Sequence, residues 1–315
     1  MGDVLLTTPC IRALRRAFPE AHIGYVADPP AEQVLRRNPY VDELLVRPSG
    51  DLIPEQLGFI RDLRRRRFDV AIDFLGNPRS ALMTWLSGAG RRIGFDVRVR
   101  QHAYTDIVAR GDPHEYMALK FGRLLGPLGV TLRSTGLDFF VTDEERTLAR
   151  ARLEGRGIGA DDFVVSICPV SRRPGRLWPP ERFARLADRL VEHFDARLVL
   201  VYGPGEEEAV EAVRAHMGSA SAKCGFDRLA EAAALFERVD LHVGNDNGLR
   251  HVAVAAGAPT VAVFGPAGAD AWTPPGDPLH RVVQASTGRI ADVEVEPVWS
   301  AVSDLVDRLK IDRVG

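Results

Sequence analysis

Short runs rich in β-branched residues alternate with longer segments of helical periodicity along most of the chain. Strands are expected at residues 22–27, 44–47, 69–75, 163–168, 197–202, 240–243 and 260–264. Helices are expected at residues 11–18, 60–67, 81–86, 142–154, 180–193, 206–217, 227–236 and 248–256, with Asp227 as an N-cap. This alternation predicts parallel β-sheets with crossover helices, an α/β fold.

The chain has 315 residues, which fits two domains of roughly 150 residues each. A charged helical stretch is followed by Gly155, Gly157 and Gly159, and this connection places the domains at residues 1–155 and 156–315. Two doubly wound, Rossmann-like domains would face each other across a cleft at the carboxyl ends of their strands, where such sheets bind ligands. The active site is expected in that cleft.

Composition and cysteine content further limit the kind of protein this chain can be. Hydrophobic residues make up 45% and charged residues 27% of the chain, as in ordinary globular proteins. Cys10, Cys168 and Cys224 are widely spaced and form no CxxC pair, which indicates neither a disulfide framework nor a metal site and suits a reducing cytoplasm. The apolar runs are too short to cross a bilayer, and no signal segment opens the chain. We expect a cytoplasmic protein, soluble or peripheral at the inner membrane.

The net charge is only −2, but the first half is mildly basic and rich in arginine, notably at residues 64–67, 91–92, 98 and 100. These arginines fit a phosphorylated or membrane-associated partner, although a solvated helix face is the simpler explanation of residues 64–67. No basic-aromatic pattern of a nucleic-acid-binding module is present, so no nucleic-acid partner is expected.

The sharpest candidate segment is residues 243–251 (VGNDNGLRH), which leaves a predicted strand and opens a helix. The backbone N–H groups and the helix dipole at such a turn suit a diphosphate. Gly248 permits close approach, and Asn247 either caps the helix or donates to a phosphate oxygen. His251 shares the helix face of Asn247. Turns of this kind are common in α/β proteins, and a histidine at such a position is more often packed than functional.

Three other segments carry candidate groups. Residues 169–179 (PVSRRPGRLWP) hold three arginines that suit a diphosphate clamp. Residues 203–208 (GPGEEE) put carboxylates at a helix start, where they either cap the helix or bind ribose hydroxyls. Trp272, in the Gly- and Pro-rich segment 265–274, either stacks on a base or covers the core.

Near the amino end, Gly2 and Asp3 stand directly before a short apolar segment and a helix. An aspartate at a domain edge that faces a cleft could deprotonate an acceptor hydroxyl. An aspartate near a helix start is also a common cap, so both interpretations remain open.

Together these segments resemble glycosyltransferase family 9, the lipopolysaccharide heptosyltransferases. The matching segments are residues 2–9 (GDVLLTTP), 73–80 (DFLGNPRS), 91–95 (RRIGF), 176–179 (RLWP), 246–251 (DNGLRH) and 265–266 (GP). They occur in the family's order across nearly the whole chain, and that ordered set is far more specific than any one segment.

The resemblance implies a GT-B fold and an inverting transferase that needs neither metal nor cofactor. It further implies a nucleotide-diphosphate sugar donor, ADP-heptose in the best-known members, and a lipopolysaccharide-core or related glycan or glycolipid acceptor. By position, Asp3 would be the general base and Arg176 would contact the diphosphate. The donor would be bound by Ser171, Glu206, Glu207, Asp246, Asn247, Gly248 and His251, and the acceptor by Asn77 and Arg79.

The chain departs from the family pattern at three places. The family has an apolar strand and a polar loop before the Gly-Asp pair, so the first domain is expected to lack its first strand and to leave Asp3 on a loose terminus. Arg176 stands where the family commonly has lysine, and a guanidinium keeps the charge but changes the geometry. Asn247 stands where serine or threonine is usual. The donor's sugar and base therefore stay open.

Two alternative functions remain. A GT-B-like sugar-nucleotide epimerase would convert a nucleotide sugar without an acceptor, and a non-catalytic nucleotide-sugar-binding protein would bind the donor without transfer. A dinucleotide oxidoreductase is not expected, because no GxGxxG motif follows a predicted strand.

Overall fold

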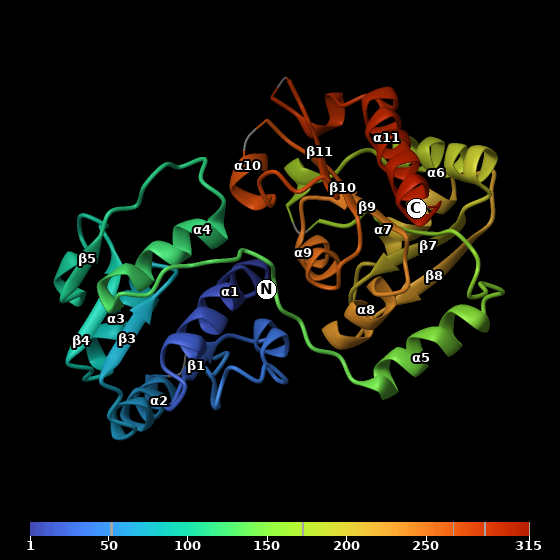
Figure 1. The fold of residues 1–315 in the computed structure, drawn as a ribbon. Helices are drawn as coiled ribbons and strands as arrows, with labels where there is room; N and C mark the ends of the chain where they lie inside the picture. The colour runs from blue at the N-terminus through green and yellow to red at the C-terminus, as the bar shows by residue number, and fades with distance from the viewer. Residues whose placement is uncertain (51–52, 172, 267, 287, 315) are drawn as a thin grey trace. The chain divides into compact units, whose positions relative to one another are not determined.

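The computed structural model describes residues 1–50, 53–171, 173–266, 268–286 and 288–314. The described chain forms two compact units (Figure 1), unit 1 from Asp3 to Asp138 and unit 2 from Phe139 onward, with Gly2 grouped with unit 2. The division falls before the position expected near residue 155. The reason is α5 (Asp143–Glu154), which packs against α8 (Leu229–Phe236) of unit 2.

Helix α5 is fixed to unit 2 by its cap and its arginines. Thr142 and Glu145 form a capping box at its start, and the helix agrees with the one expected at residues 142–154. Arg146 then reaches Glu237 through its Nε, at 2.7 Å from Oε2. The Nη2 of Arg152 donates to the Gly225 carbonyl at 2.6 Å. This helix therefore belongs to the second unit, although it precedes the glycines that suggested a boundary.

Unit 2 is built on one parallel sheet of six strands. The strands are β6 (Val164–Cys168), β7 (Arg197–Tyr202), β8 (Ser221–Gly225), β9 (Leu241–Asn245), β10 (Thr260–Phe264) and β11 (His280–Gln284). Their order is β8-β7-β6-β9-β10-β11, and every neighbouring pair is parallel. Every residue of β6, β9 and β10 is buried, as expected for the centre of a sheet covered on both faces.

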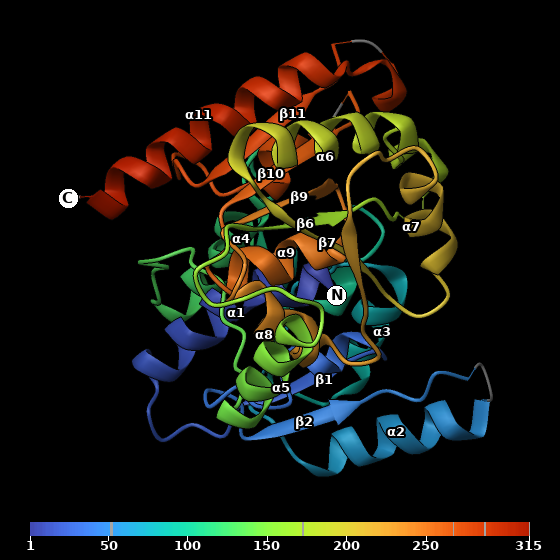
Figure 2. The ribbon, with the colours of Figure 1, turned by 90° about the vertical axis from the view of Figure 1, so that its right-hand side faces the viewer.

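Helices cover both faces of this sheet (Figure 2). On one side lie α6 (Pro180–Phe194) and α11 (Val295–Val314), and on the other lie α8 and α9 (Gly248–Ala255). The remaining helices of unit 2 are α7 (Glu207–Arg214), α10 (Ala269–Trp272), and the 3-10 turns η4 (Pro174–Arg176) and η5 (Ile290–Asp292). An extended core cluster packs α6 and α11 residues such as Phe183 and Val302 onto β6 and β9.

The expectation that Asp227 caps a helix is wrong. Helix α8 begins at Leu229 with Arg228 as its N-cap residue and no side-chain capping bond. Asp227 stands one residue too early to accept from the first turn in the usual cap geometry. The helix is held instead by burial, because Ala232 through Phe236 are all buried.

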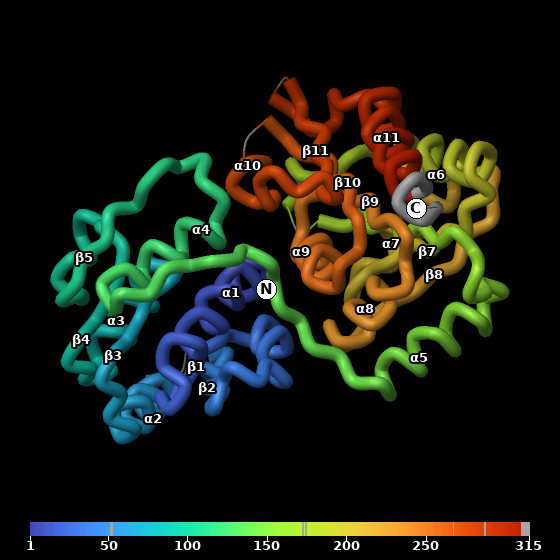
Figure 3. Tube along the Cα trace, viewed as in Figure 1, coloured from blue at the N-terminus to red at the C-terminus, as the bar shows by residue number. Residues whose placement is uncertain are grey.

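Unit 1 carries two separate parallel sheets. One joins β1 (Gly24–Ala27) to β2 (Glu43–Val46), and the other has the order β3-β4-β5, with β3 (Val70–Asp73), β4 (Arg91–Phe95) and β5 (Asp106–Val108). The helices are α1 (Gly2–Ala17), α2 (Ile53–Arg65), α3 (Pro78–Leu86) and α4 (Met117–Gly122), with the 3-10 turns η1 (Ala31–Val34), η2 (Gln101–Ala103) and η3 (Arg123–Leu128). Figure 3 traces this succession along the chain.

Helix α1 starts nine residues before the helix expected at 11–18 and runs through Pro9. A proline inside a helix cannot donate to the carbonyl four residues earlier, here that of Leu5. The Thr8 hydroxyl donates to that carbonyl at 2.7 Å and so replaces the missing bond. Asp3 therefore lies in the first turn of a helix, in place of the loose terminus expected from the sequence.

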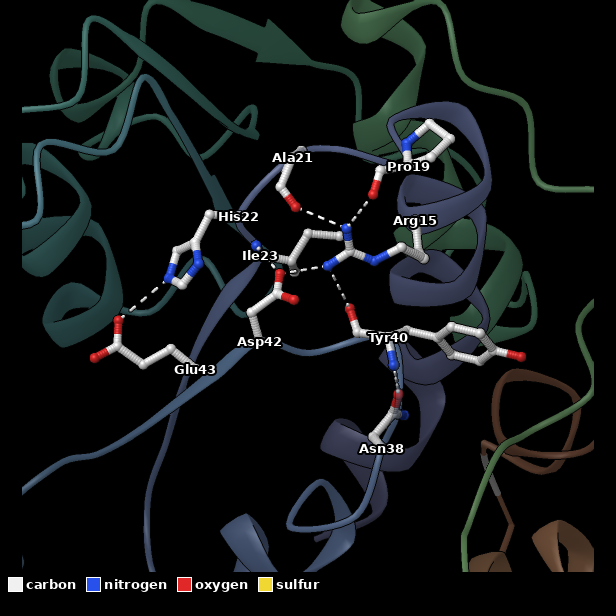
Figure 4. A network of polar contacts seen from close by, with 9 residues as sticks. All are labelled: Arg15, Pro19, Ala21, His22, Ile23, Asn38, Tyr40, Asp42 and Glu43. Carbon is white, nitrogen blue, oxygen red and sulfur yellow. Dashed lines mark hydrogen bonds and ion pairs between the residues drawn. The ribbon is translucent and has the colours of Figure 1, made fainter.

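The carboxyl end of α1 is tied to the first sheet by Arg15 (Figure 4). Its guanidinium donates to the carbonyls of Pro19 at 2.8 Å and Ala21 at 2.7 Å, and it pairs with Asp42. The Asp42 carboxylate also accepts from the Ile23 amide at 2.7 Å. The network fixes the turn between α1 and β1 against the start of β2.

None of the helices in the described residues has the length and apolar character needed to span a bilayer. Cys10, Cys168 and Cys224 are all free and buried.

Candidate functional site

The candidate site lies at the carboxyl end of the unit 2 sheet, where the strand order reverses. The chain goes from β6 outward to β7 and β8 and then returns to the other side of β6 with β9. In doubly wound sheets the loops after two such strands diverge and leave room for a ligand. The loop after β6 contains Ser171 and Arg176, and the turn after β9 contains Asp246, Asn247 and Gly248.

Asn245, the last residue of β9, holds the β6 loop in place. Its side chain is completely buried. The amide Oδ1 accepts from the Trp178 backbone N–H at 3.0 Å, and the Nδ2 donates to the Pro169 carbonyl at 2.9 Å. One side chain thus fixes both ends of the loop that carries Arg176.

Asn247 acts as the N-cap of α9. Its Oδ1 accepts from the Arg250 amide at 3.0 Å. Its Nδ2 donates to the Val170 carbonyl at 2.9 Å and contacts the Cys168 sulfur at 3.2 Å. Asn247 was expected either to cap the helix or to donate to a phosphate oxygen, and in the structure it caps the helix. Its amide nitrogen also holds the β6 loop.

Arg176 and Asp246 form an ion pair between the two loops. The Arg176 side chain is 36% exposed, whereas that of Asp246 is only 9% exposed. Burial raises the pKa of Asp246, and the nearby Arg176 guanidinium opposes that rise. A guanidinium has five N–H donors, so Arg176 can keep Asp246 as a partner and still present donors to an anion.

The start of α9 supplies further donors. Gly248 is its first residue, and the amides of the first helical turn have no acceptor within the helix. They carry the positive end of the helix dipole, which favours a negatively charged group. Arg176 and the amides at Gly248 therefore form a combination suited to a diphosphate.

His251 lies in α9 and is buried, with its ring 5.9 Å from that of Trp272. Burial, assisted by the charge of Arg250, lowers the pKa of His251 to about 3. The ring is therefore neutral at physiological pH and can act only as a neutral donor or acceptor. Trp272 packs against the cluster of Ala262, Phe264 and Ala269, in agreement with its core-covering interpretation.

Two of the three glutamates after β7, Glu206 and Glu207, have different surroundings. Glu206 folds back on its own loop and accepts from the Gly203 amide at 2.9 Å. Glu207 pairs with Lys223 at 2.7 Å, and this partner lowers the pKa of the Glu207 carboxyl. Glu206 is thus the better placed of the two for a ligand at the strand ends, because Glu207 already has a cation beside it.

Ser171, in the loop after β6, accepts from the Arg173 amide at 3.2 Å and so closes a local turn.

The predicted acceptor-side residues belong to unit 1 and line one cavity there. Asp3 lies in the first turn of α1, Asn77 caps α3, and Arg79 is exposed on α3. All three are among the lining residues of a cavity of about 780 Å³. Asn77 accepts from the amides of Arg79 at 3.0 Å and Ser80 at 2.9 Å, so its Oδ1 already has a structural role.

Arg172, one of the three arginines expected in the clamp, lies outside the described residues. Across the part of the chain that the structure describes, no three His, Cys, Asp or Glu side chains gather as a metal site would require.

Sequence reasoning missed two residues that shape the site, Asn245 and Arg250. Arg250 is fully buried and donates to the Trp272 carbonyl at 3.1 Å and to Thr273 Oγ1 at 2.7 Å. Its guanidinium also lies 5.1 Å from the centre of the Phe264 ring. Asn245 ends an apolar strand, and Arg250 lies among small helix residues, so both are polar residues at positions that the surrounding sequence predicts to be buried. Because polar residues are seldom buried, this mismatch is the sequence signal that could have identified them.

The profile of "Glycosyltransferase family 9 (heptosyltransferase)" matches residues 57–297. The lipopolysaccharide heptosyltransferase 2 of Salmonella typhimurium is 27% identical over 306 residues, which cover 91% of this chain and 86% of that protein. A solved glycosyl transferase family 9 structure from Veillonella parvula has a TM-score of 0.86 at 25% identity and covers 98% of this chain and 94% of that one. The E. coli ADP-heptose lps heptosyltransferase II shares the fold, with a TM-score of 0.78 at 22% identity over 97% and 96% of the two chains.

The fold is that of a GT-B glycosyltransferase. The chain belongs to glycosyltransferase family 9, because the family profile matches well over half of its length. The resemblance drawn from the six sequence segments is thereby confirmed, as is the expectation of an enzyme.

The buried state of His251 predicts a pH dependence of stability. A histidine in the unfolded chain takes up a proton below a pH of about 6.5, whereas folded His251 does so only near a pH of about 3. The unfolded state therefore binds more protons between these values, so the free energy of unfolding falls as the pH is lowered through 6.5. We expect His251→Gln to reduce the slope by about 1.4 kcal/mol per pH unit between pH 4.5 and 6. Urea unfolding across this range measures the slope.

The matched control is His216→Gln, which removes an exposed histidine of the same unit. An unchanged slope in the His251 variant would show that this ring is not kept neutral by the fold.

Proposed function

We propose that this enzyme transfers a heptose from an ADP-linked donor to a lipopolysaccharide-core acceptor, with inversion and without a metal ion or cofactor. The solved E. coli relative is named an ADP-heptose lps heptosyltransferase, and the Salmonella relative a lipopolysaccharide heptosyltransferase. The observation that carries the proposal is the position of Arg176 beside Asp246 and the first turn of α9, at the switch point of the unit 2 sheet.

The leaving group of the proposed reaction is a nucleoside diphosphate, which gains negative charge as the sugar departs. Arg176 and the amides at the start of α9 are fixed before the reaction by Asn245 and Asn247. Donors that are already oriented stabilise a developing charge without reorganisation. Asp246 orients the Arg176 guanidinium, Glu206 is proposed for the ribose, and Ser171, Glu207, Gly248 and His251 complete the proposed donor set.

The acceptor hydroxyl must lose its proton as it attacks the anomeric carbon. We assign this proton to Asp3, whose carboxylate lies in the first turn of α1 and lines the unit 1 cavity. Asn77 and Arg79, on the same cavity, are proposed to contact the acceptor. The acceptor oxygen bonds to the anomeric carbon while the bond to the diphosphate oxygen breaks, which inverts that carbon.

A lipid-linked acceptor requires the cytoplasmic enzyme to work at the inner membrane surface. Helix α3 presents Arg79, Leu82 and Trp85 at successive helical turns, and Leu82 and Trp85 are 51% and 54% exposed. A helix with an exposed tryptophan and an exposed arginine is suited to the headgroup region of an anionic bilayer. We assign peripheral membrane contact to this face of α3.

Substitution of Arg176 tests the donor site. We expect Arg176→Gln to weaken ADP binding by about 10- to 100-fold, because a hydrogen bond to a charged group contributes about 1.5–3 kcal/mol. Arg176→Lys should retain most of the affinity, since the charge remains. Calorimetric titration with ADP measures both, and Arg185→Gln, an exposed arginine on α6, is the control. Wild-type affinity in Arg176→Gln would remove this residue from the donor site.

Substitution of Asp3 tests the base. A positioned base contributes about 10²–10⁴-fold, so Asp3→Asn should lower kcat by that factor while ADP affinity stays unchanged. Sugar transfer from ADP-heptose to a heptose-deficient lipopolysaccharide core measures kcat. The control is Asp62→Asn, which alters an exposed carboxylate of the same unit. Unchanged turnover in Asp3→Asn would assign the proton to another group.

Vesicle binding tests the membrane contact. The protein should co-sediment with anionic vesicles at low ionic strength and detach at high salt, since the attraction is screened within about 10 Å at 0.1 M. Trp85→Ser should lower the bound fraction, whereas Leu148→Ser, an exposed leucine of unit 2, should not. Absence of co-sedimentation by the unaltered chain would contradict the assignment.

A further inference from the structure

Two of the sequence segments that resemble the family lie side by side in unit 1. Residues 73–80 begin with the last residue of β3, and residues 91–95 form β4. The proposed function uses two residues of the first segment and none of the second. The strands pair in parallel with Asp73 directly opposite Gly94, so the two segments meet at this pair of residues.

The Asp73 carboxylate organises the turn that follows β3. Its Oδ1 accepts from the Leu75 amide at 3.1 Å and from the Gly76 amide at 2.9 Å. Asn77, the N-cap residue of α3, follows directly. One carboxylate oxygen thus fixes the path of the chain between β3 and the start of α3.

A buried tyrosine holds the other oxygen of this carboxylate. The Tyr104 hydroxyl donates to Asp73 Oδ2 at 2.7 Å. Tyr104 is 6% exposed and Asp73 is 4% exposed. Burial, and after it the neighbouring Asp73, raise the pKa of Tyr104, so its hydroxyl stays protonated and remains a donor. The Asp73 carboxylate therefore accepts three hydrogen bonds and has almost no contact with solvent.

Gly94 makes room for this tyrosine. A β-carbon on Gly94 would lie 2.4 Å from atoms of the Tyr104 ring, far closer than carbon atoms that are not bonded to each other approach. A larger residue at this position would push the ring away from Asp73. The glycine of residues 91–95 and the aspartate of residues 73–80 thus serve the same hydrogen bond.

The turn is also held from the loop after β4. Arg100 Nη1 donates to the Gly76 carbonyl. Asn77 then accepts from the Arg79 amide at 3.0 Å as the cap of α3. The backbone of residues 75–79 is therefore fixed by side chains at successive positions. This stretch carries the two predicted acceptor residues, Asn77 and Arg79, which line the unit 1 cavity.

We propose that Asp73 is a positioning residue for the acceptor site. Tyr104, for which Gly94 leaves room, holds the Asp73 carboxylate. The carboxylate in turn sets the backbone that carries Asn77 and Arg79. This inference rests on the proposed function, in which those two residues contact the acceptor. Asp73 acts through the turn, because its oxygens already accept three hydrogen bonds at a buried position.

Three substitutions in the full chain test this role. Asp73→Ala removes the acceptor of the two turn amides, whereas Asp73→Asn keeps an acceptor oxygen on a side chain of the same size. Tyr104→Phe removes only the hydroxyl, and Tyr116→Phe, which alters another buried tyrosine of unit 1, is its control. Initial rates of sugar transfer at varied concentrations of a heptose-deficient lipopolysaccharide core separate KM from kcat. Calorimetric titration measures ADP affinity.

We expect Asp73→Ala to raise the acceptor KM by about tenfold or more, with kcat and ADP affinity nearly unchanged. Asp73→Asn should restore most of the acceptor affinity, because its amide oxygen still accepts from the turn. Tyr104→Phe should raise the acceptor KM by about threefold, and Tyr116→Phe should leave it unchanged. Partial unfolding has a different signature, since a smaller active fraction lowers the apparent kcat and leaves KM as it is.

An unchanged acceptor KM in Asp73→Ala would overturn the positioning role. A loss of kcat of about hundredfold in Asp73→Asn would also overturn it, because Asp73 would then itself take the acceptor proton. Amide hydrogen exchange of Leu75 and Gly76 is the second measurement, and we expect it to be faster in Asp73→Ala than in the unaltered chain. Equal exchange rates would show that the carboxylate does not hold the turn.

The exchange measurement also separates this inference from the proposed function. Absence of sugar transfer by the unaltered chain would contradict the proposed function and the acceptor role of the turn. Faster exchange of Leu75 and Gly76 in Asp73→Ala would even then support the part of the inference that concerns the turn itself.

Discussion

The parallel pairing of β6 with β9 is the constraint on which the rest of the donor side depends. Its register sets Cys168 opposite Gly244, so the two strands end side by side at the place where the strand order reverses. A β-carbon on Gly244 would lie 2.9 Å from the Cys168 carbonyl oxygen, which explains why the close approach needs glycine. The loops that follow are consequently held at one edge of a rigid, fully buried pair of strands.

Three consecutive residues at the end of β9 have different roles. Asn245 ends β9 and is turned inward, where its amide holds the two ends of the β6 loop. Asn247 caps α9 and holds the beginning of the same loop through Val170. Asp246, between them, meets Arg176. The two asparagine amides thus hold the β6 loop and the start of α9 in position. The charge that can act on a diphosphate is on Arg176, whose loop these amides hold.

Both units are built from parallel strands joined by helices, but their sheets differ. Unit 2 has a continuous sheet with helices on both faces, and its buried strands show the apolar runs expected of such a sheet. Unit 1 repeats the strand and helix succession, but its described strands form two separate sheets. The predicted acceptor-side residues Asp3, Asn77 and Arg79 all line one cavity of this unit.

The sequence by itself determined the α/β class, most strand positions and the family. Apolar runs such as residues 197–202 and 260–264 coincide with β7 and β10, because local periodicity specifies a buried parallel strand. Only the tertiary structure decided that α5 belongs to unit 2, that Asp227 caps nothing, and that Asn245 and Arg250 are buried supports of the site. These outcomes depend on packing and hydrogen bonds between segments far apart in the chain, which no local pattern of residues encodes.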